Sequence, residues 1–147
     1  MYKHILIPTD GSELSDKAIN AAIDFARETK ARVTGFTAMP EYPIPSEAEL
    51  MARRAISPSE YERKAKQEAD AILKPIAERA RAAGVDFDCD HALNDRPDDA
   101  IIKAAQKHGC DLIFMASHGR RGISALIHGS ETRGVLTHSD IPTLVYR

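Results

Sequence analysis

The chain has 147 residues, of which 43% are apolar and 29% are charged, as expected for one globular domain with a buried core. Its formal net charge of −2 argues against a dedicated nucleic-acid-binding protein, because such proteins carry a strong basic surplus. No apolar run approaches the roughly 20 residues that span a bilayer, and the N-terminus lacks the apolar segment of a signal peptide, so no membrane association is expected.

The first part of the chain predicts a strand, a helix and a second strand. Residues 3–8 form a short apolar run that ends at Pro8, and Thr9-Asp10-Gly11-Ser12 is typical of a tight turn. Residues 13–30 have helical periodicity, and residues 32–38 are β-prone. Gly35 is expected to mark close packing. The apolar face expected for the helix consists of Leu14, Ala18, Ala21, Ala22 and Phe25.

Residues 39–56 interrupt this alternation. Pro40, Pro43 and Pro45 preclude regular structure early in the segment, although residues 47–54 can form a short helix. A connection of this length in a small domain is usually functional or mobile. We therefore expect either a flexible flap or an interface segment.

A long helix is predicted from Ser57-Pro58-Ser59-Glu60, which has the residues of a capping box with proline at the first helical position. Gly84 is the expected end, and Pro75 is expected to kink or divide the helix. Alternating charges along this segment indicate a solvated face. The expected buried stripe consists of Ala65, Ala69, Ile72, Leu73, Ile76 and Ala80.

The second half of the chain continues the alternation. Strands are predicted at residues 85–92, 112–115 and 141–146, with helices ending near His108 and running from about Gly129-Ser130 to His138. Strands that alternate with helices in this way predict an α/β fold with a doubly wound, parallel sheet in a single domain, residues 1–147.

A glycine-rich stretch runs from Met115 to Gly122 and continues to Thr132. It follows a buried strand and precedes a helix, where uncovered backbone N–H groups and the helix dipole can bind phosphate. Arg120 and Arg121 can screen phosphate charge, although exposed arginines in loops are common. The alternative interpretation is a turn that merely joins a strand to a helix.

Asp10 is expected to face this loop across the sheet, because ligands of doubly wound sheets bind beyond the carboxyl ends of the strands. A carboxylate opposite a phosphate-binding loop suits a nucleotide, with Asp10 bonding ribose hydroxyls. The alternative role for Asp10 is an N-cap or Asx turn at the start of the first helix. The chain has neither a Walker-type loop nor a GxGxxG fingerprint.

Three segments together resemble the universal stress protein family: residues 3–12, residues 111–119, and the end of the chain from Gly129-Ser130 through residues 141–146. The resemblance covers essentially the whole chain. It implies an adenine nucleotide alpha hydrolase-like fold, namely a five-stranded parallel sheet of order 3-2-1-4-5 with helices on both faces. It also implies a homodimer. Independently, the apolar C-terminal strand would leave unpaired backbone groups at a sheet edge, which favours pairing with a second copy.

One branch of that family binds ATP through the pattern Gly-x2-Gly-x9-Gly-Ser/Thr. Gly119, Gly129 and Ser130 match the later part of the pattern, whereas Ala116 occupies the first glycine position. If the backbone there is extended, alanine costs little; if it needs positive φ or direct contact, affinity falls. The resemblance implies that Asp10 holds the ribose. The complete set of cofactor-binding residues that it implies is Pro8, Thr9, Asp10, Ala38, Met115, Ala116, Gly119, Gly129, Ser130 and Glu131, with Ala38 and Met115 flanking the adenine and the last four at the phosphates.

The function expected from this resemblance is an ATP-binding, cytoplasmic stress-response or signalling module with at most slow ATP hydrolysis. Mg²⁺ or Mn²⁺ would be held mainly by the phosphates, since the scattered histidines have no metal-ligand spacing. Cys89 and Cys110 lack CxxC spacing and favour a reducing compartment. Two alternatives are a dimeric interaction protein of the same fold without nucleotide, and a slow ATP hydrolase or nucleotidyl transferase that uses Asp10 or His118.

Overall fold

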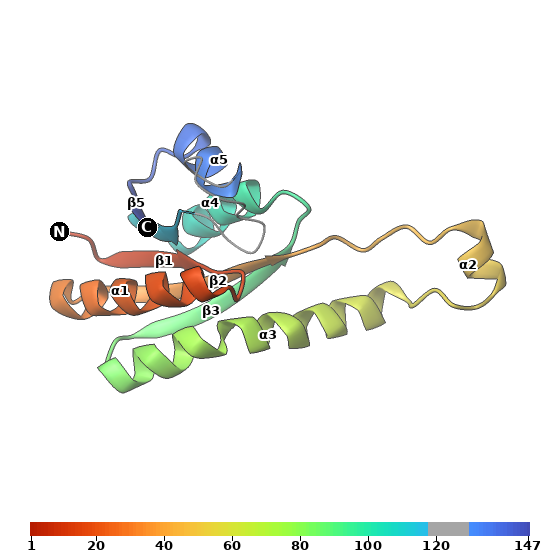
Figure 1. The fold of residues 1–147 in the computed structure, drawn as a ribbon, viewed down its shortest axis with the longest axis horizontal. Coiled ribbons are helices and arrows are strands. Elements are labelled where there is room, and N and C mark those ends of the chain that lie inside the picture. The colour runs from red at the N-terminus through yellow and green to blue at the C-terminus, as the bar shows by residue number, and fades with distance from the viewer. Residues whose placement is uncertain (118–129) are drawn as a thin grey trace.

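The computed structural model describes residues 1–117 and 130–147. Its centre is a parallel sheet of five strands in the order β3-β2-β1-β4-β5, which confirms the predicted topology (Figure 1). The strands are β1 (His4–Pro8), β2 (Arg32–Met39), β3 (Phe87–Leu93), β4 (Leu112–Ala116) and β5 (Thr143–Tyr146). None of the described helices is long and apolar enough to cross a membrane.

Helices cover both faces of the sheet, as expected for a doubly wound fold. One core cluster joins α1 and α3 to Ile5 and Ile7 of β1, and the other joins α4 and α5 to Leu6 of the same strand. Successive side chains of a strand point to opposite faces, so a continuous apolar strand supplies both cores. The helices are α1 (Glu13–Thr29), α2 (Glu47–Met51), α3 (Pro58–Ala83), α4 (Pro97–His108) and α5 (Ser130–His138).

The predicted apolar face of α1 is partly wrong. Leu14, Ala21 and Phe25 are only half-buried, whereas Ile19 and Ile23 are fully buried against the sheet. Phe25 lies at the margin of the core, with its ring centroid 6.1 Å from that of Phe114. The sheet therefore contacts a neighbouring stripe of the helix, because a wide apolar face permits more than one rotation about the helix axis.

The start of α3 has one of the two hydrogen bonds of the predicted capping box. Ser57 is the N-cap and accepts a hydrogen bond from Glu60 N–H at 3.2 Å, but the side chain of Glu60 pairs with Lys64 at 3.6 Å. The reciprocal bonds of a capping box occur instead at Ser46 and Glu49, at the start of α2.

Pro75 does not divide α3, which runs without interruption from Pro58 to Ala83. The predicted stripe is confirmed except that Ile72 is half-buried. The close packing predicted at Gly35 is also confirmed, because a Cβ atom there would lie 3.0 Å from Ile76 Cδ1. Gly84 ends the helix in the left-handed region, with φ 69°.

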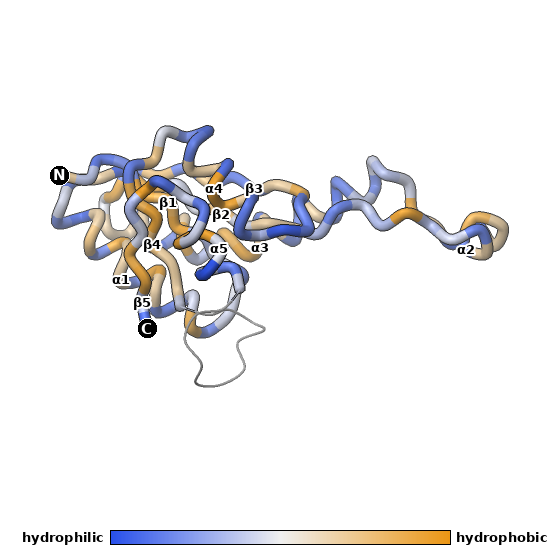
Figure 2. Tube along the Cα trace, turned by 90° about the horizontal axis from the view of Figure 1, so that it is seen from above, coloured by the Kyte–Doolittle hydropathy of each residue, from blue (hydrophilic) through white to orange (hydrophobic). Residues whose placement is uncertain are grey.

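Residues 40–57 form an arm that projects from the body beyond the carboxyl end of β2 and carries α2 at its far end (Figures 1 and 2). The helix within it is shorter than expected, since α2 ends at Met51 and Arg53 has a left-handed φ of 52°. We refer to residues 40–57 as the arm.

Candidate functional site

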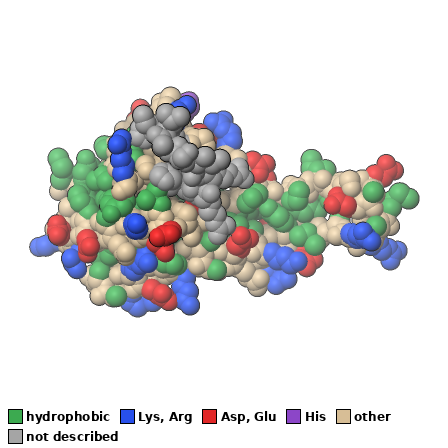
Figure 3. All heavy atoms as spheres, viewed as in Figure 1, with side chains coloured by type: hydrophobic (Ala, Val, Ile, Leu, Met, Phe, Trp, Pro, Cys, Tyr) green, Lys and Arg blue, Asp and Glu red, His purple; other side chains and the backbone are tan. Residues whose placement is uncertain are grey.

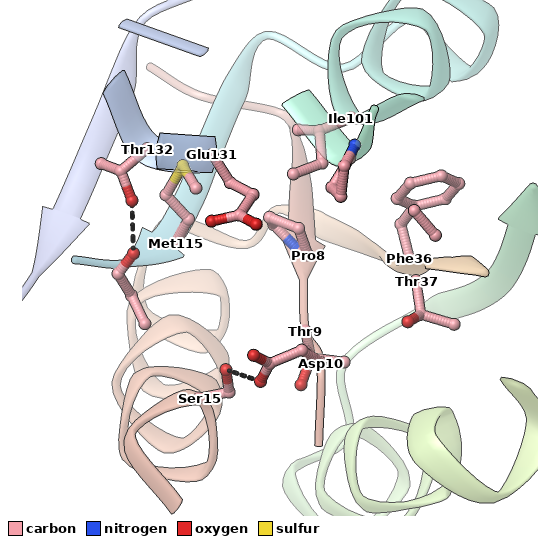
Figure 4. Close-up of a pocket in the computed structure, with 13 residues that line it drawn as sticks. Pro8, Thr9, Asp10, Ser15, Phe36, Thr37, Ile101, Met115, Glu131 and Thr132 are labelled. Carbon is pink, nitrogen blue, oxygen red and sulfur yellow. Dashed lines mark hydrogen bonds between the residues drawn. The ribbon is translucent and has the colours of Figure 1, made fainter. Parts of the chain in front are cut away.

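A pocket lies at the carboxyl ends of β1, β2 and β4, where the chain reverses its winding direction (Figure 4). This is the position at which open parallel sheets bind ligands. The cavity measures about 120 Å³. Its lining consists of Pro8, Thr9, Asp10, Ser15, Phe36, Thr37, Ala38, Pro97, Ile101, Met115, Ala116, Glu131 and Thr132.

The backbone of β1 alternates in direction between its two neighbouring strands. Thr9 N–H donates to Phe36 O of β2 at 2.9 Å, whereas His4 O accepts from Asp111 N–H on the β4 side at 2.9 Å. Because this alternation has a period of two residues, the backbone of Pro8 faces β4.

Proline has no N–H, so Pro8 cannot donate a hydrogen bond towards β4. The pairing of β1 with β4 covers two positions and ends at Leu6 and Ile113. The pairing of β1 with β2, in contrast, continues to Pro8 and Phe36. Pro8 therefore helps to end the β1–β4 ladder at the point where the pocket begins.

The Asp10 carboxylate is held at the edge of the pocket by an Asx turn. Its Oδ1 atom accepts from Ser12 N–H at 2.9 Å and from Ser15 Oγ at 3.0 Å. The N-cap of α1 is Ser12, so of the two structural roles considered for Asp10, the Asx turn is the one present. Gly11 permits this tight turn because its φ is 79°.

The opposite wall of the pocket is formed by the end of β4 and the first turn of α5. The Thr132 hydroxyl donates to the carbonyl oxygens of Ala116 and Ser117, each at 3.1 Å. Ala116 is the last residue of β4 and pairs with Tyr146 of β5, so its backbone is extended. These bonds fasten the start of α5 to the end of β4 beside the pocket.

Apolar side chains form a narrow slot between these two polar walls. Phe36 and Ala38 come from β2, Met115 from β4 and Ile101 from α4. Figure 4 shows Met115 and Pro8 on either side of the Glu131 carboxylate, which reaches into the pocket from α5. A slot of this kind, with a few polar groups at its ends, is typical of a small-molecule site.

The described part of the lining is anionic. Asp10 and Glu131 are its charged side chains, and no lysine or arginine is among the described residues that line the cavity. Within residues 1–117 and 130–147, no three His, Cys, Asp or Glu side chains cluster as metal ligands. A polyanionic ligand in this pocket would therefore need backbone N–H groups, a helix N-terminus or its own cation to balance its charge.

The structure brings together seven of the ten residues implied by the resemblance: Pro8, Thr9, Asp10, Ala38, Met115, Ala116 and Glu131. Ser130 begins α5 next to them and is exposed, with its hydroxyl 3.3 Å from Glu131 Oε2. Gly119 and Gly129 lie outside the described residues, as do His118, Arg120, Arg121 and Gly122.

Sequence analysis did not identify several residues of the lining. Ser15 and Thr132 are small hydroxyl residues just inside helix N-termini, where polar side chains are too common to signal a site. The sequence pattern indicates Ile101 as an ordinary core residue of α4. Only its position near the end of the sheet makes it part of the pocket. The other unpredicted lining residues are Phe36, Thr37 and Pro97.

Comparison with known proteins identifies the architecture. The model of the universal stress protein family matches residues 1–147. Universal stress protein MJ0531 of Methanocaldococcus jannaschii is 32% identical over 152 residues, which cover 100% of this chain and 83% of that protein. Universal stress protein YxiE of Bacillus subtilis is 28% identical, with full coverage of both chains.

Solved structures agree with this match. The structure of MJ0577, also from Methanocaldococcus jannaschii, has a TM-score of 0.80 at 27% identity and covers 99% of this chain and 95% of its own. A universal stress protein solved with cAMP has a TM-score of 0.72 at 24% identity, covering 99% and 97%. A family member from Arabidopsis thaliana solved with AMP has a TM-score of 0.66 at 13% identity, covering 97% and 90%. The last two show the likeness of the fold.

Proposed function

The chain belongs to the universal stress protein family, and from this membership we propose that it binds an adenine nucleotide, ATP, in the pocket between β1 and β4. Relatives of the same fold have been solved with AMP and with cAMP. The observation that carries the proposal is the composition of the pocket. An apolar slot lies at the switch point of the sheet, with Asp10 on one side and the first turn of α5 on the other.

Each part of the pocket suits one part of the nucleotide. The adenine ring would lie in the slot beside Ala38 and Met115, and Asp10 would accept hydrogen bonds from the ribose hydroxyls. Gly119, Gly129, Ser130 and the backbone of Glu131 would bind the phosphates, as the family resemblance implies. The N-terminus of α5 favours negative charge there because its backbone N–H groups lack intrahelical partners.

Ala116 is compatible with this arrangement. Its backbone is extended in β4, and the described residues other than glycine with positive φ are Lys30 and Arg53. The position therefore does not require glycine for conformational reasons. Its side chain adds one methyl group to the wall of the pocket.

A divalent cation would accompany ATP. Mg²⁺ or Mn²⁺ bound mainly by the phosphates would reduce their repulsion from the Asp10 and Glu131 carboxylates. We propose no catalytic residue, and any hydrolysis would be slow. The nucleotide would act as a signal of the cytoplasmic energy state, read by partners of a stress-response module.

We also propose a homodimer through β5. This strand lies at one edge of the sheet and is half-buried along its length. An exposed strand edge presents unpaired N–H and C=O groups that a second copy can satisfy about a two-fold axis.

Nucleotide binding is tested by denaturing the purified protein, identifying released nucleotide by mass spectrometry, and titrating ATP calorimetrically with Mg²⁺. Asp10→Ala should weaken binding tenfold or more, because a hydrogen bond to a charged group is worth about 1.5–3 kcal/mol. Asp10→Asn keeps an oxygen for the Asx turn and separates loss of charge from loss of structure. Asp24→Asn, on the exposed face of α1, is the matched control.

Three outcomes distinguish the possible functions. Binding that depends on Asp10 supports the proposal. No released nucleotide and no heat at millimolar ATP would leave an interaction protein of the same fold. ATP turnover that Asp10→Ala abolishes would identify an enzyme, whereas turnover unchanged in that variant would indicate contamination.

A further inference from the structure

The tip of the arm carries large apolar side chains that are exposed to solvent. Ile44 is 93% exposed, Met51 81% and Leu50 59%. Figure 3 shows apolar side chains at the far end of the arm between acidic and basic ones, and Figure 2 shows how far this end lies from the body. The described pocket lining contains no residue of the arm, so these side chains do not cover the ligand site.

The base of the arm is held by contacts between its two limbs and with α3. Tyr42 packs edge-on against Tyr61, with ring centroids 5.6 Å apart. The Tyr42 hydroxyl donates to Ile56 O and the Tyr61 hydroxyl to Pro40 O, each at 2.7 Å. These bonds join the outgoing limb of the arm to the returning limb and to α3. Such bracing favours an interface segment over the flexible flap, because an ordered surface loses less entropy on binding.

Charges of opposite sign lie on either side of the apolar tip. Glu47 is at the start of α2, and Arg53 and Arg54 follow its end, with Leu50 and Met51 midway between them. Within the part of the chain that the structure describes, Glu47 and these two arginines have no ion-pair partner. Opposite charges at equal spacing from an apolar centre are self-complementary under a two-fold rotation.

We propose that the arm tip binds the arm tip of a second copy of this chain, with the two α2 helices antiparallel about a two-fold axis. Leu50 and Met51 of both copies meet at the centre. Glu47 of each copy then faces Arg53 and Arg54 of the other. The charges fix the antiparallel direction, and the apolar contact supplies most of the affinity.

This interface is separate from the one proposed at β5. The arm leaves the sheet at β2, whereas β5 is the edge strand beyond β4. A chain that uses both two-fold interfaces forms tetramers or longer assemblies. The arm interface is small, which places it among weak, concentration-dependent contacts. It does not depend on nucleotide binding.

A charge swap tests the pairing by sedimentation velocity across a concentration series. The single variant Glu47→Arg and the double variant Arg53→Glu/Arg54→Glu should each weaken association through the arm at least tenfold, because like charges then face each other. All three substitutions together should restore it. Gln67→Arg, on the exposed face of α3 outside the arm, is the control and should change nothing. Glu49 is left intact because it caps α2.

The same series can overturn the proposal. If the triple variant associates as weakly as the single and double variants, the arm tip binds a surface other than a second arm tip, one whose charges the substitutions do not reverse. If none of the variants changes association, the arm takes no part in it. Circular dichroism of each variant excludes unfolding as the cause.

Cross-linking gives a second, independent readout. In a Cys89→Ser background, Met51→Cys should form a disulfide-linked dimer under mild oxidation, since residues near a two-fold axis approach their own copies. Gln67→Cys should not. Equal cross-linking of both variants would indicate random collision and would contradict the pairing.

Discussion

Single residues set the shape of the pocket through the backbone. Pro8 presents no N–H to β4, so the ladder between β1 and β4 ends where the cavity begins. Ala116 lies on the other side of this opening and is only 8% exposed. Its extended backbone can carry a side chain, and the size of that side chain then decides how much room a ligand has.

We expect the ATP affinity to depend on the size of the side chain at position 116 and not on the conformational freedom of its backbone. Ala116→Gly should change the ATP affinity less than about threefold, because no positive φ is needed there. Ala116→Val adds two methyl groups to the pocket wall and should reduce affinity tenfold or more, since overpacking a filled site costs about 1–3 kcal/mol. Calorimetric titration compares the two variants. A large gain in affinity for Ala116→Gly would show that the methyl group obstructs the ligand.

Asp111 fastens the start of β1 to the turn before β4. Its carboxylate accepts from the N–H of Lys3 at 2.9 Å and of His4 at 3.0 Å. Burial by itself raises the pKa of this carboxyl, but the hydrogen bonds from His4 and Lys3 outweigh it and hold the pKa below the usual value. The charged form is therefore favoured by folding.

The stability contributed by Asp111 should depend on pH in a definite direction. Because its pKa is lower in the folded state, the contribution is complete above the unfolded pKa of about 3.9 and is lost as pH falls through the folded pKa. Asp111→Asn should cost about 1 kcal/mol at pH 7. Urea unfolding should show that the difference in the free energy of unfolding between Asp111→Asn and the parent protein becomes smaller as pH falls from 7 to 2. A difference that grows in acid would contradict this role.

At the scale of helices, the position of α5 depends on its contact with α4. A Cβ atom on Gly134 would lie 2.6 Å from Asp98 Cβ, so only glycine lets the two helices approach this closely. The same helix begins at Ser130 and brings Glu131 and Thr132 to the pocket. The packing of α5 is therefore coupled to the wall of the pocket.

Gly134→Ala should destabilise the fold and weaken nucleotide binding together. Alanine is the better helix former by about 1 kcal/mol, but the clash with Asp98 forces the helices apart and outweighs that gain. We expect a net loss of about 1–2 kcal/mol in denaturant unfolding. Thr137→Ala on the exposed side of α5 is the matched control. Unchanged affinity in a clearly destabilised Gly134→Ala variant would show that the pocket does not depend on the seating of α5.

At the scale of the whole molecule, we propose two regions for binding further copies: the β5 edge and the arm. The backbone of Pro142, just before β5, and of Tyr146, the last residue of β5, faces β4, because their carbonyls accept from Ile113 and Ser117 N–H at 2.9 and 2.8 Å. The alternation along a strand then places the N–H of Val145 on the outer side. This donor is available to a second copy.

Val145→Pro should abolish association through β5 and leave the fold intact. Proline removes the outward N–H without touching the ladder to β4, which is where edge strands tolerate it. Val145→Thr keeps the N–H and is the control. Sedimentation velocity should show that association through β5 is lost in Val145→Pro and kept in Val145→Thr. A dimer that survives Val145→Pro and instead depends on Glu47 and Arg53 would be an arm dimer.

Much of the fold was predictable because the sequence periodicity is strong. The apolar runs of β1 and β4 and the capping residues Ser57 and Gly84 of α3 mark their elements locally, without reference to the rest of the chain. The order of the strands came from family resemblance. The local pattern gave a partly wrong result at the apolar face of α1, where more than one rotation of the helix buries apolar side chains. At Pro75 it allowed either a kink or a division of the helix, and the continuous α3 excludes the division.

The residues alone predicted the alternation of strands and helices and placed Asp10 opposite the glycine-rich stretch, and the family resemblance added Glu131 to the predicted site. Only the tertiary structure decided that Ile101 and Thr132 join them, because these residues reach the pocket through the packing of helices from distant parts of the chain. It also decided that Ala116 is extended, through pairing with β5, and that residues 40–57 project as a braced arm. Local preference fixes what each segment is; contacts between distant segments fix what each side chain faces.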